Sequence, residues 1–183
     1  RFQSLWAFVK KVMIPEFNID GNLPEGIYSV SEEEFLDRFT THSARRKWLG
    51  ERLKEILSLA KSTGKTERIF VWGSFVTVKE SPNDMDILLV MSEDFQLETV
   101  PEECRHLFDY IRARVRFNAD VFWSKASIGE DTLSLWLETY QLTKDFKRRV
   151  FVEVKVSCYK MTISYKLPNK QFLIWKKSFW KPE

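Results

Sequence analysis

Residues 68–90 read RIFVWGSFVTVKESPNDMDILLV, in which two apolar runs flank a Gly-Ser turn and a polar spacer. Short runs rich in valine, isoleucine and aromatic residues, bounded by Gly, Pro and Asn, predict β-strands. We therefore expect one strand at about 68–72 and a second at about 85–91. The link between them is short, and its last part, Ser-Pro-Asn-Asp at 81–84, is predicted to be a turn.

Two aspartates lie at the start of the second predicted strand. Because alternate residues of a strand point to the same face, Asp84 and Asp86 should lie side by side, level with the Gly-Ser turn at 73–74. Two carboxylates about 4 Å apart repel by roughly 4 kcal/mol at an effective dielectric of about 20, so a cation is expected between them. Oxygen-only ligands favour Mg²⁺ or Mn²⁺, which usually arrive with the phosphates of a substrate.

This arrangement resembles the catalytic signature of the polymerase-β-type nucleotidyltransferase superfamily, which has Gly-Ser, a short spacer, Asp-x-Asp and a third acidic residue on a later strand. The third carboxylate is best matched by Asp120, at the start of a predicted strand at 119–123. The segment 14–27 and the spacer are also similar to a family of short bacterial nucleotidyltransferase-like proteins, some of which belong to toxin–antitoxin-like gene pairs. The similarity covers roughly residues 13–156, and in the spacer it rests on Thr77, Lys79, Glu80 and Pro82.

The resemblance implies an enzyme dependent on Mg²⁺ (or Mn²⁺) that transfers a nucleoside monophosphate from an NTP to a hydroxyl group and releases pyrophosphate. The expected NTP is ATP, the acceptor is a protein or an RNA, and a toxin-like role with a cognate antitoxin is implied as well. The catalytic and metal-binding residues that the resemblance implies are Asp84, Asp86 and Asp120. The nucleotide-binding residues that it implies are Gly73, Ser74 and Lys79.

Each candidate residue, taken alone, also has a structural explanation. Asp84 follows Ser-Pro-Asn and could be only a turn residue, and Asp86 could pair with a core arginine such as Arg68. Asp120 could cap a neighbouring segment, and Gly-Ser is common in turns. Their order along the predicted strand ends favours the metal site. The alternative function is a catalytically inactive nucleotide- or protein-binding module that keeps the fold.

The fold is predicted to be α/β (or α+β), a small mixed β-sheet with helices packed on it, of nucleotidyltransferase type. Residues 14–30 should be extended or loop-like, because Pro and Gly punctuate them. Ser31 and Glu34 form a capping box that predicts a short helix to about residue 39. Ser43 can cap a longer helix that runs to about residue 62. Its buried stripe should be Leu49, Leu53, Ile56, Leu57 and Ala60. Its charged residues, which include Arg45, Arg46 and Lys47, are expected to form a solvated face.

Two further helices and a last strand are expected after the second aspartate. One helix should run from about residue 101 to 115, with a buried stripe of Cys104, Leu107, Phe108, Ile111 and Val115. Another should be capped by Asp131 or Thr132, with Leu133, Trp136, Leu137 and Tyr140 on its apolar face. Alternating valines at 150, 152, 154 and 156 predict the final strand.

The composition fits one domain in a chain of 183 residues. Two cysteines do not make a disulfide framework, so we expect a reducing cytoplasm. Two histidines are too few and too isolated for a zinc site. There is no apolar run near the ~20 residues needed to cross a bilayer and no recognisable signal peptide, so no membrane partner is expected.

The basic charge lies in the flanks. The net charge is +3 over residues 1–12, −5 over the predicted domain at 13–156 and +5 over residues 157–183. Residues 1–12 have helical apolar spacing and are either a partner- or membrane-binding helix or a flanking, non-native segment. Residues 157–183 form a basic, aromatic C-terminal extension, interpreted either as a single-strand nucleic-acid-binding tail or as an edge strand with a non-native extension. A basic overall charge is therefore weak support for a nucleic-acid-binding domain.

Overall fold

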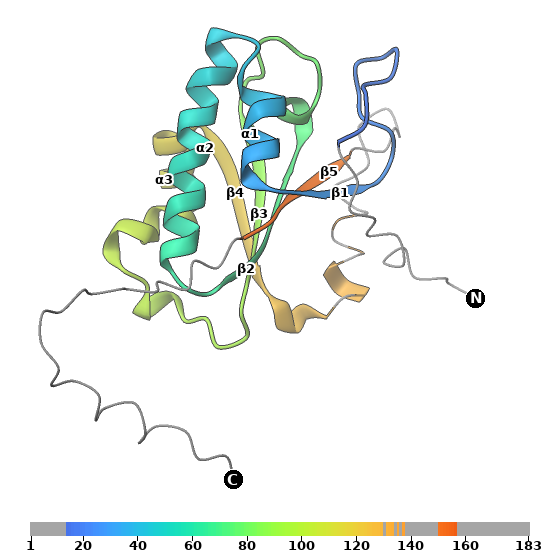
Figure 1. Ribbon diagram of the computed structural model, residues 1–183. Coiled ribbons are helices and arrows are strands. Elements are labelled where there is room, and N and C mark those ends of the chain that lie inside the picture. Colours follow the sequence, from blue (N-terminus) through green and yellow to red (C-terminus); the bar gives the residue numbers. More distant parts are fainter. Residues whose placement is uncertain (1–13, 130, 134, 136, 138–149, 157–183) are drawn as a thin grey trace, which may run out of the picture.

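The computed structural model describes residues 14–129, 131–133, 135, 137 and 150–156. They form a five-stranded mixed β-sheet with helices packed against it, which confirms the predicted α/β class (Figure 1). Among these residues, no helix is long and apolar enough to cross a membrane.

The sheet has the strand order β1-β5-β2-β3-β4. Its strands are β1 (Ile27–Val30), β2 (Thr66–Trp72), β3 (Met85–Met91), β4 (Ala119–Lys125) and β5 (Phe151–Val154). The pairs β1–β5 and β3–β4 are parallel, and β2 is antiparallel to both of its neighbours. The four strands predicted from apolar runs are confirmed, and β1 is a strand within the segment predicted to be only extended or loop-like.

Two helices begin at the capping residues predicted for them. Helix α1 (Glu32–Thr40) has Ser31 at its N-cap in a complete capping box with Glu34, and α2 (Ala44–Ser62) has Ser43 at its N-cap. The predicted stripe of α2 is buried in full: Leu49, Leu53, Ile56, Leu57 and Ala60. Both helices lie together with α3 (Tyr110–Phe117) against one face of the sheet (Figure 1).

The single helix predicted at 101–115 is wrong, because the chain changes helix type at Asp109. A 3₁₀ helix covers Glu102–Phe108, and α3 then begins afresh at Tyr110. The Asp109 side chain accepts a hydrogen bond from the backbone N–H of Arg112 at 3.0 Å, which is the geometry of an N-cap. An N-cap residue lies outside the helix it starts, so the two helical segments do not share one apolar stripe.

The new start also changes which side chains of α3 are buried. Ile111 and Val115 were predicted to be buried but are 72% and 83% exposed. Ala113 and Phe117 are buried instead, against the same core as α2. The first half of the predicted stripe is correct, since Cys104 and Leu107 are fully buried.

The opposite face of the sheet carries a second, smaller core. Phe70 and Trp72 of β2, Leu88 and Val90 of β3 and Phe151 of β5 lie in it, together with Leu133 and Leu137. Asp131 and Thr132 both lie within a helical segment, so the prediction that one of them caps this helix is wrong. The predictions for Trp136, Tyr140, residues 1–12 and residues 157–183 lie outside the described residues.

Candidate functional site

The Gly-Ser turn lies directly against the second aspartate. After β2 the chain enters a short 3₁₀ helix, Gly73–Val76, in which Gly73 has a φ of +79°. A Cβ atom at this position would collide with Oδ2 of Asp86. Only glycine combines this positive φ with the absence of a side chain, so glycine is needed at position 73 for both reasons. Trp72 is the Cα partner of Asp86, which places the turn level with the carboxylate.

The three predicted carboxylates lie at one end of the β3–β4 pair. Asp86 and Asp120 are Cα partners in the parallel ladder, so their side chains stand on the same face of adjacent strands. Asp84 precedes β3 and alternates with Asp86. Asp84 and Asp120 keep 37% and 17% of their side-chain surface exposed, so ligands can reach them.

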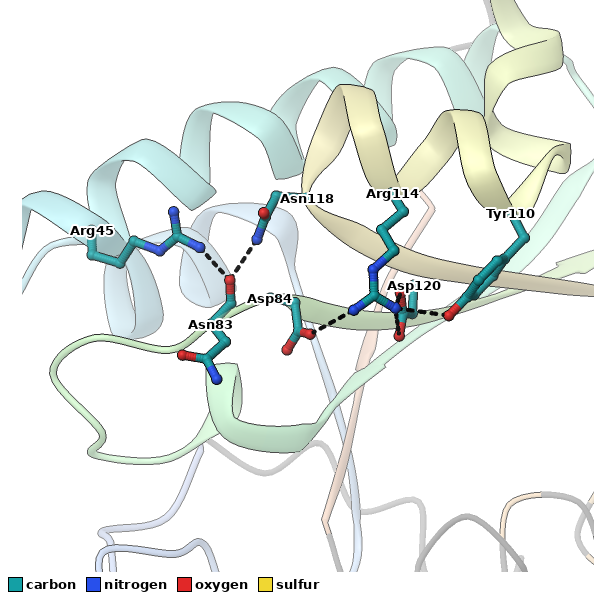
Figure 2. Close-up of polar contacts among 7 residues, drawn as sticks. All are labelled: Arg45, Asn83, Asp84, Tyr110, Arg114, Asn118 and Asp120. Carbon is teal, nitrogen blue, oxygen red and sulfur yellow. Dashed lines mark hydrogen bonds and ion pairs between the residues drawn. The ribbon is translucent and has the colours of Figure 1, made fainter.

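A cation already lies among these carboxylates, and sequence reasoning missed it. Nη1 of Arg114 donates to both oxygens of Asp120, at 2.9 and 3.2 Å, and to the hydroxyl oxygen of Tyr110 at 2.9 Å (Figure 2). Nη2 of the same arginine lies 4.0 Å from Oδ2 of Asp84. The hydrogen bond with Tyr110 and the charge of Asp120 raise the pKa of the Arg114 guanidinium, so it stays charged.

The chemical type of the ligand atoms at the site suits a hard divalent cation. Three carboxylates supply only oxygen ligands, which Mg²⁺ and Mn²⁺ prefer, and Gly73 lets one of them, Asp86, lie directly against the turn. Within the described part of the chain, no group of three or more acidic, histidine or cysteine side chains is close enough together to hold a metal ion. Arg114 supplies the positive charge at Asp84 and Asp120 in the arrangement seen here.

Removing Arg114 should therefore strengthen metal binding. We expect Arg114→Ala to bind Mn²⁺ roughly tenfold more tightly than the unmodified protein, because a competing positive charge beside Asp120 is lost. Electron paramagnetic resonance of free Mn²⁺, titrated without nucleotide, measures the affinity directly. Arg112→Ala is the matched control, since Arg112 is exposed and pairs with Asp109 instead. Equal Mn²⁺ affinity in the two variants would show that Arg114 does not compete with the metal.

The peptide before Asp84 is held from two helices. The carbonyl oxygen of Asn83 accepts hydrogen bonds from Nδ2 of Asn118, at 2.5 Å, and from the guanidinium of Arg45 (Figure 2). Asn118 is the left-handed C-cap of α3, with a φ of 54°, a conformation that asparagine tolerates better than most residues. The position of Asp84 thus depends on α2 and α3 as well as on β3.

Arg46 holds the loop that follows the Gly-Ser turn. The prediction that this residue belongs to a solvated face is wrong, because only 2% of it is exposed. Its guanidinium donates to the carbonyl oxygens of Phe39, Phe75, Thr77 and Lys79, at distances of 2.5–2.9 Å. Burial lowers the pKa of this guanidinium from its usual value. Its position three residues before Leu49, on the apolar stripe of α2, was the signal that could have revealed it.

The remaining nucleotide-binding candidates lie on this loop. Ser74 is half-buried in the 3₁₀ helix, and its carbonyl oxygen accepts from the Thr77 hydroxyl at 2.8 Å. Lys79 is exposed, and among the described residues its side chain makes no ion pair with the three carboxylates. The structure thus brings Gly73 next to Asp86 and leaves Lys79 on the loop surface.

The structural explanations for Asp86 and Asp120 were an ion pair with Arg68 and a capping role, and the structure shows a partner for Arg68 and one for Asp120. Arg68 lies opposite Val90 in the β2–β3 ladder rather than opposite Asp86, and its Nε donates to Glu153 at 2.6 Å. Asp120 is bound by Arg114.

The N-terminal segment contacts the spacer directly. The backbone N–H of Val78 donates to the carbonyl oxygen of Gly21 at 2.9 Å. Gly21 has a φ of +75°, and a Cβ atom there would collide with the Val78 side chain. The two segments that carry the sequence resemblance therefore form one structural unit beside the site.

The comparisons with known proteins identify a family without an assigned activity. A family model described as a family of unknown function, DUF6932, matches residues 15–155, so the chain belongs to that family. Searches of curated proteins and of solved structures each found no match.

Proposed function

For this member of the DUF6932 family, we propose metal-dependent transfer of a nucleoside monophosphate from an NTP to a hydroxyl group, with release of pyrophosphate. The observation that carries the proposal is the ladder partnership of Asp86 and Asp120 on one face, level with a turn in which Gly73 abuts Asp86. Carboxylates are seldom placed side by side for stability alone, because they repel. A pair of carboxylates at strand ends suits catalysis through a bound cation.

The side chains have separate roles in this proposal. Asp84, Asp86 and Asp120 would hold Mg²⁺ or Mn²⁺, which when bound supplies positive charge for the phosphates of the substrate. Asp120, on the outer of the two strands, would accept the proton of the attacking hydroxyl. The Gly73–Ser74 turn, which has no side chain at its first position, allows phosphate oxygens to approach backbone N–H groups. Arg114 would transfer its hydrogen bonds from Asp120 to a substrate phosphate.

The expected partners follow from the resemblance of the sequence. ATP is the expected donor, a protein or RNA hydroxyl is the acceptor, and a toxin-like role with a cognate antitoxin in the cytoplasm is part of the proposal.

A second candidate function is a catalytically inactive module that binds a nucleotide or a protein. Arg114 favours it, because an arginine already neutralises Asp120 and approaches Asp84. A permanent arginine would remove the need for a metal. The two functions differ in a measurable way, since only the enzyme requires a divalent cation to bind an NTP productively.

The deciding experiment is label transfer. The full chain is incubated with Mg²⁺ and each α-³²P-labelled NTP in turn, with the protein itself, a co-expressed neighbouring protein and total RNA as acceptors. We expect covalent label with α-labelled ATP and none with γ-labelled ATP, because the γ-phosphate leaves with pyrophosphate. An Asp84→Ala/Asp86→Ala double variant is the control for the site. A folded protein that transfers no label from any NTP to any of these acceptors would favour the inactive module.

A further inference from the structure

A cavity of about 550 Å³ lies along β4, where residues 121–124 line it together with Leu88 of the neighbouring β3. Four aromatic side chains line it, together with Leu88 and Thr132. The aromatic residues are Phe108, Tyr110, Phe122 and Trp123. A volume of this size lies within the range of small-molecule binding sites in proteins.

The cavity begins one side chain further along the strands than the carboxylates. Leu88 follows Asp86 by two residues on β3, and Phe122 follows Asp120 by two residues on β4. Residues two apart on a strand share a face and lie about 6.6 Å apart. A group in the cavity is therefore separated from the carboxylates by a gap that the ribose of a nucleotide would bridge.

The aromatic rings of the lining pack against one another in two pairs. The rings of Tyr110 and Phe122 have centroids 6.0 Å apart, and those of Phe108 and Trp123 are 5.7 Å apart in an edge-to-face arrangement. Aromatic side chains bind nucleobases by stacking, which tolerates every base because each has a π-face. The few polar groups in the lining, such as the hydroxyls of Ser124 and Thr132, would give only weak preference among the bases.

Arg114 supplies the complementary charge at the carboxylate side of the cavity. Tyr110 lines the cavity and accepts a hydrogen bond from Arg114 at 2.9 Å. The Arg114 side chain is 54% exposed, so its guanidinium can be reached from solvent. Guanidinium groups bind phosphate oxygens in bidentate geometry. An aromatic cavity joined to an accessible guanidinium matches a nucleotide better than a purely apolar ligand.

We propose that this cavity binds the base of a nucleotide whose 5′-phosphate lies at Arg114. The inference deepens the proposed function and rests on it for the reaction that consumes the nucleotide. Binding itself uses the cavity walls and Arg114, and it requires neither a metal ion nor transfer chemistry. It can therefore be tested separately from catalysis.

The test fills the cavity from its rim. Thr132 and its neighbour Asp131 are both exposed, but only Thr132 lines the cavity. AMP is titrated into the full chain by calorimetry in the presence of EDTA. We expect Thr132→Trp to weaken AMP binding at least about tenfold, because the indole occupies the space of the base. Asp131→Trp adds the same bulk outside the cavity and should leave the affinity unchanged. Thermal unfolding of both variants reports that the fold is kept.

Two further ligands separate the base from the phosphate. Adenosine should lose affinity in Thr132→Trp and keep it in Arg114→Ala. Ribose 5-phosphate should show the opposite pattern. Absence of AMP binding to the unmodified protein, or equal losses in Thr132→Trp and Asp131→Trp, would overturn the inference. AMP binding of the expected pattern without any label transfer would support the cavity and count against the transferase. Label transfer unaffected by Thr132→Trp would show that the base binds elsewhere.

Discussion

Asp86→Asn is expected to lower nucleotidyl transfer at least about 100-fold, equivalent to about 2.7 kcal/mol of transition-state stabilisation. Asp86 is central to the site, since it is the ladder partner of both Trp72 and Asp120 and its Oδ2 packs directly against Gly73. Asparagine keeps the shape of the side chain but removes the negative charge that a divalent cation requires. The rate of label transfer from α-labelled ATP, at saturating Mg²⁺, measures the loss.

An aspartate beyond the opposite end of β3 provides the control. Asp94 follows the other end of the strand, is exposed and is hydrogen-bonded to Lys65 and Ser92. Asp94→Asn should transfer label at the unmodified rate. The unfolding midpoint of Asp86→Asn should move by no more than about 4 °C, equivalent to about 1 kcal/mol, because the substitution is isosteric. A variant that stays folded and keeps its full transfer rate would remove Asp86 from the active site.

Much of the fold follows from local sequence signals. The serines at 31 and 43 start α1 and α2 as predicted. Each hydroxyl accepts a hydrogen bond from a backbone N–H only three residues later, so the signal for the helix start is local. Strands β2, β3 and β4 follow from apolar runs whose ends carry Gly, Pro or Asp. Strand β1 has only four residues after Gly26, so its pairing with β5, more than 120 positions away, leaves no local signal.

The helical errors have local causes that competed with the apolar period. At Asp109 the pattern from 101 to 115 continues without interruption, but a capping aspartate restarts the helix and shifts the buried face to Ala113 and Phe117. At Arg46 the period was right and the residue type misled, because a charged residue is rarely buried unless its donors find acceptors. Three of its four acceptors, the carbonyl oxygens of Phe75, Thr77 and Lys79, lie more than 25 positions away.

The residues of the site that are close together in the sequence were predicted, and those brought in by tertiary structure were predicted less well or missed. Asp84 and Asp86 are related by alternation along one strand, and the short connection between β2 and β3 brings the Gly73 turn level with them. Asp120 joins them only because β4 runs parallel to β3, and a parallel pair needs a long crossover connection. Arg114 lies on that crossover, so its ion pairs depend on tertiary structure.

Arg46→Met is expected to destabilise the fold by at least about 3 kcal/mol. Methionine fills similar space with no donors, so the carbonyl oxygens of Phe39 and Phe75 would be left buried without the hydrogen bonds of 2.8 Å that they now accept. The guanidinium also lies 5.5 Å from the centre of the Phe75 ring, and that contact is lost as well. For a protein of this size the unfolding midpoint should fall by about 6–12 °C, measured by circular dichroism.

Lys47→Met separates burial from a change in helix propensity. Lys47 is the exposed neighbour of Arg46 on α2, so its loss should change stability by no more than about 0.5 kcal/mol. Arg46→Lys retains the charge but offers a compact ammonium, which cannot reach the carbonyl oxygen of Phe39 in α1 and also the three carbonyl oxygens at 75, 77 and 79. Its unfolding midpoint should fall between those of the other two variants. Equal midpoints for Arg46→Met and Lys47→Met would mean that the loop after Gly73 is held by packing alone. With the expected order, the same arginine that stabilises the fold also fixes the backbone carbonyls of Thr77 and Lys79, which ties the shape of the candidate phosphate-binding loop to the stability of α2.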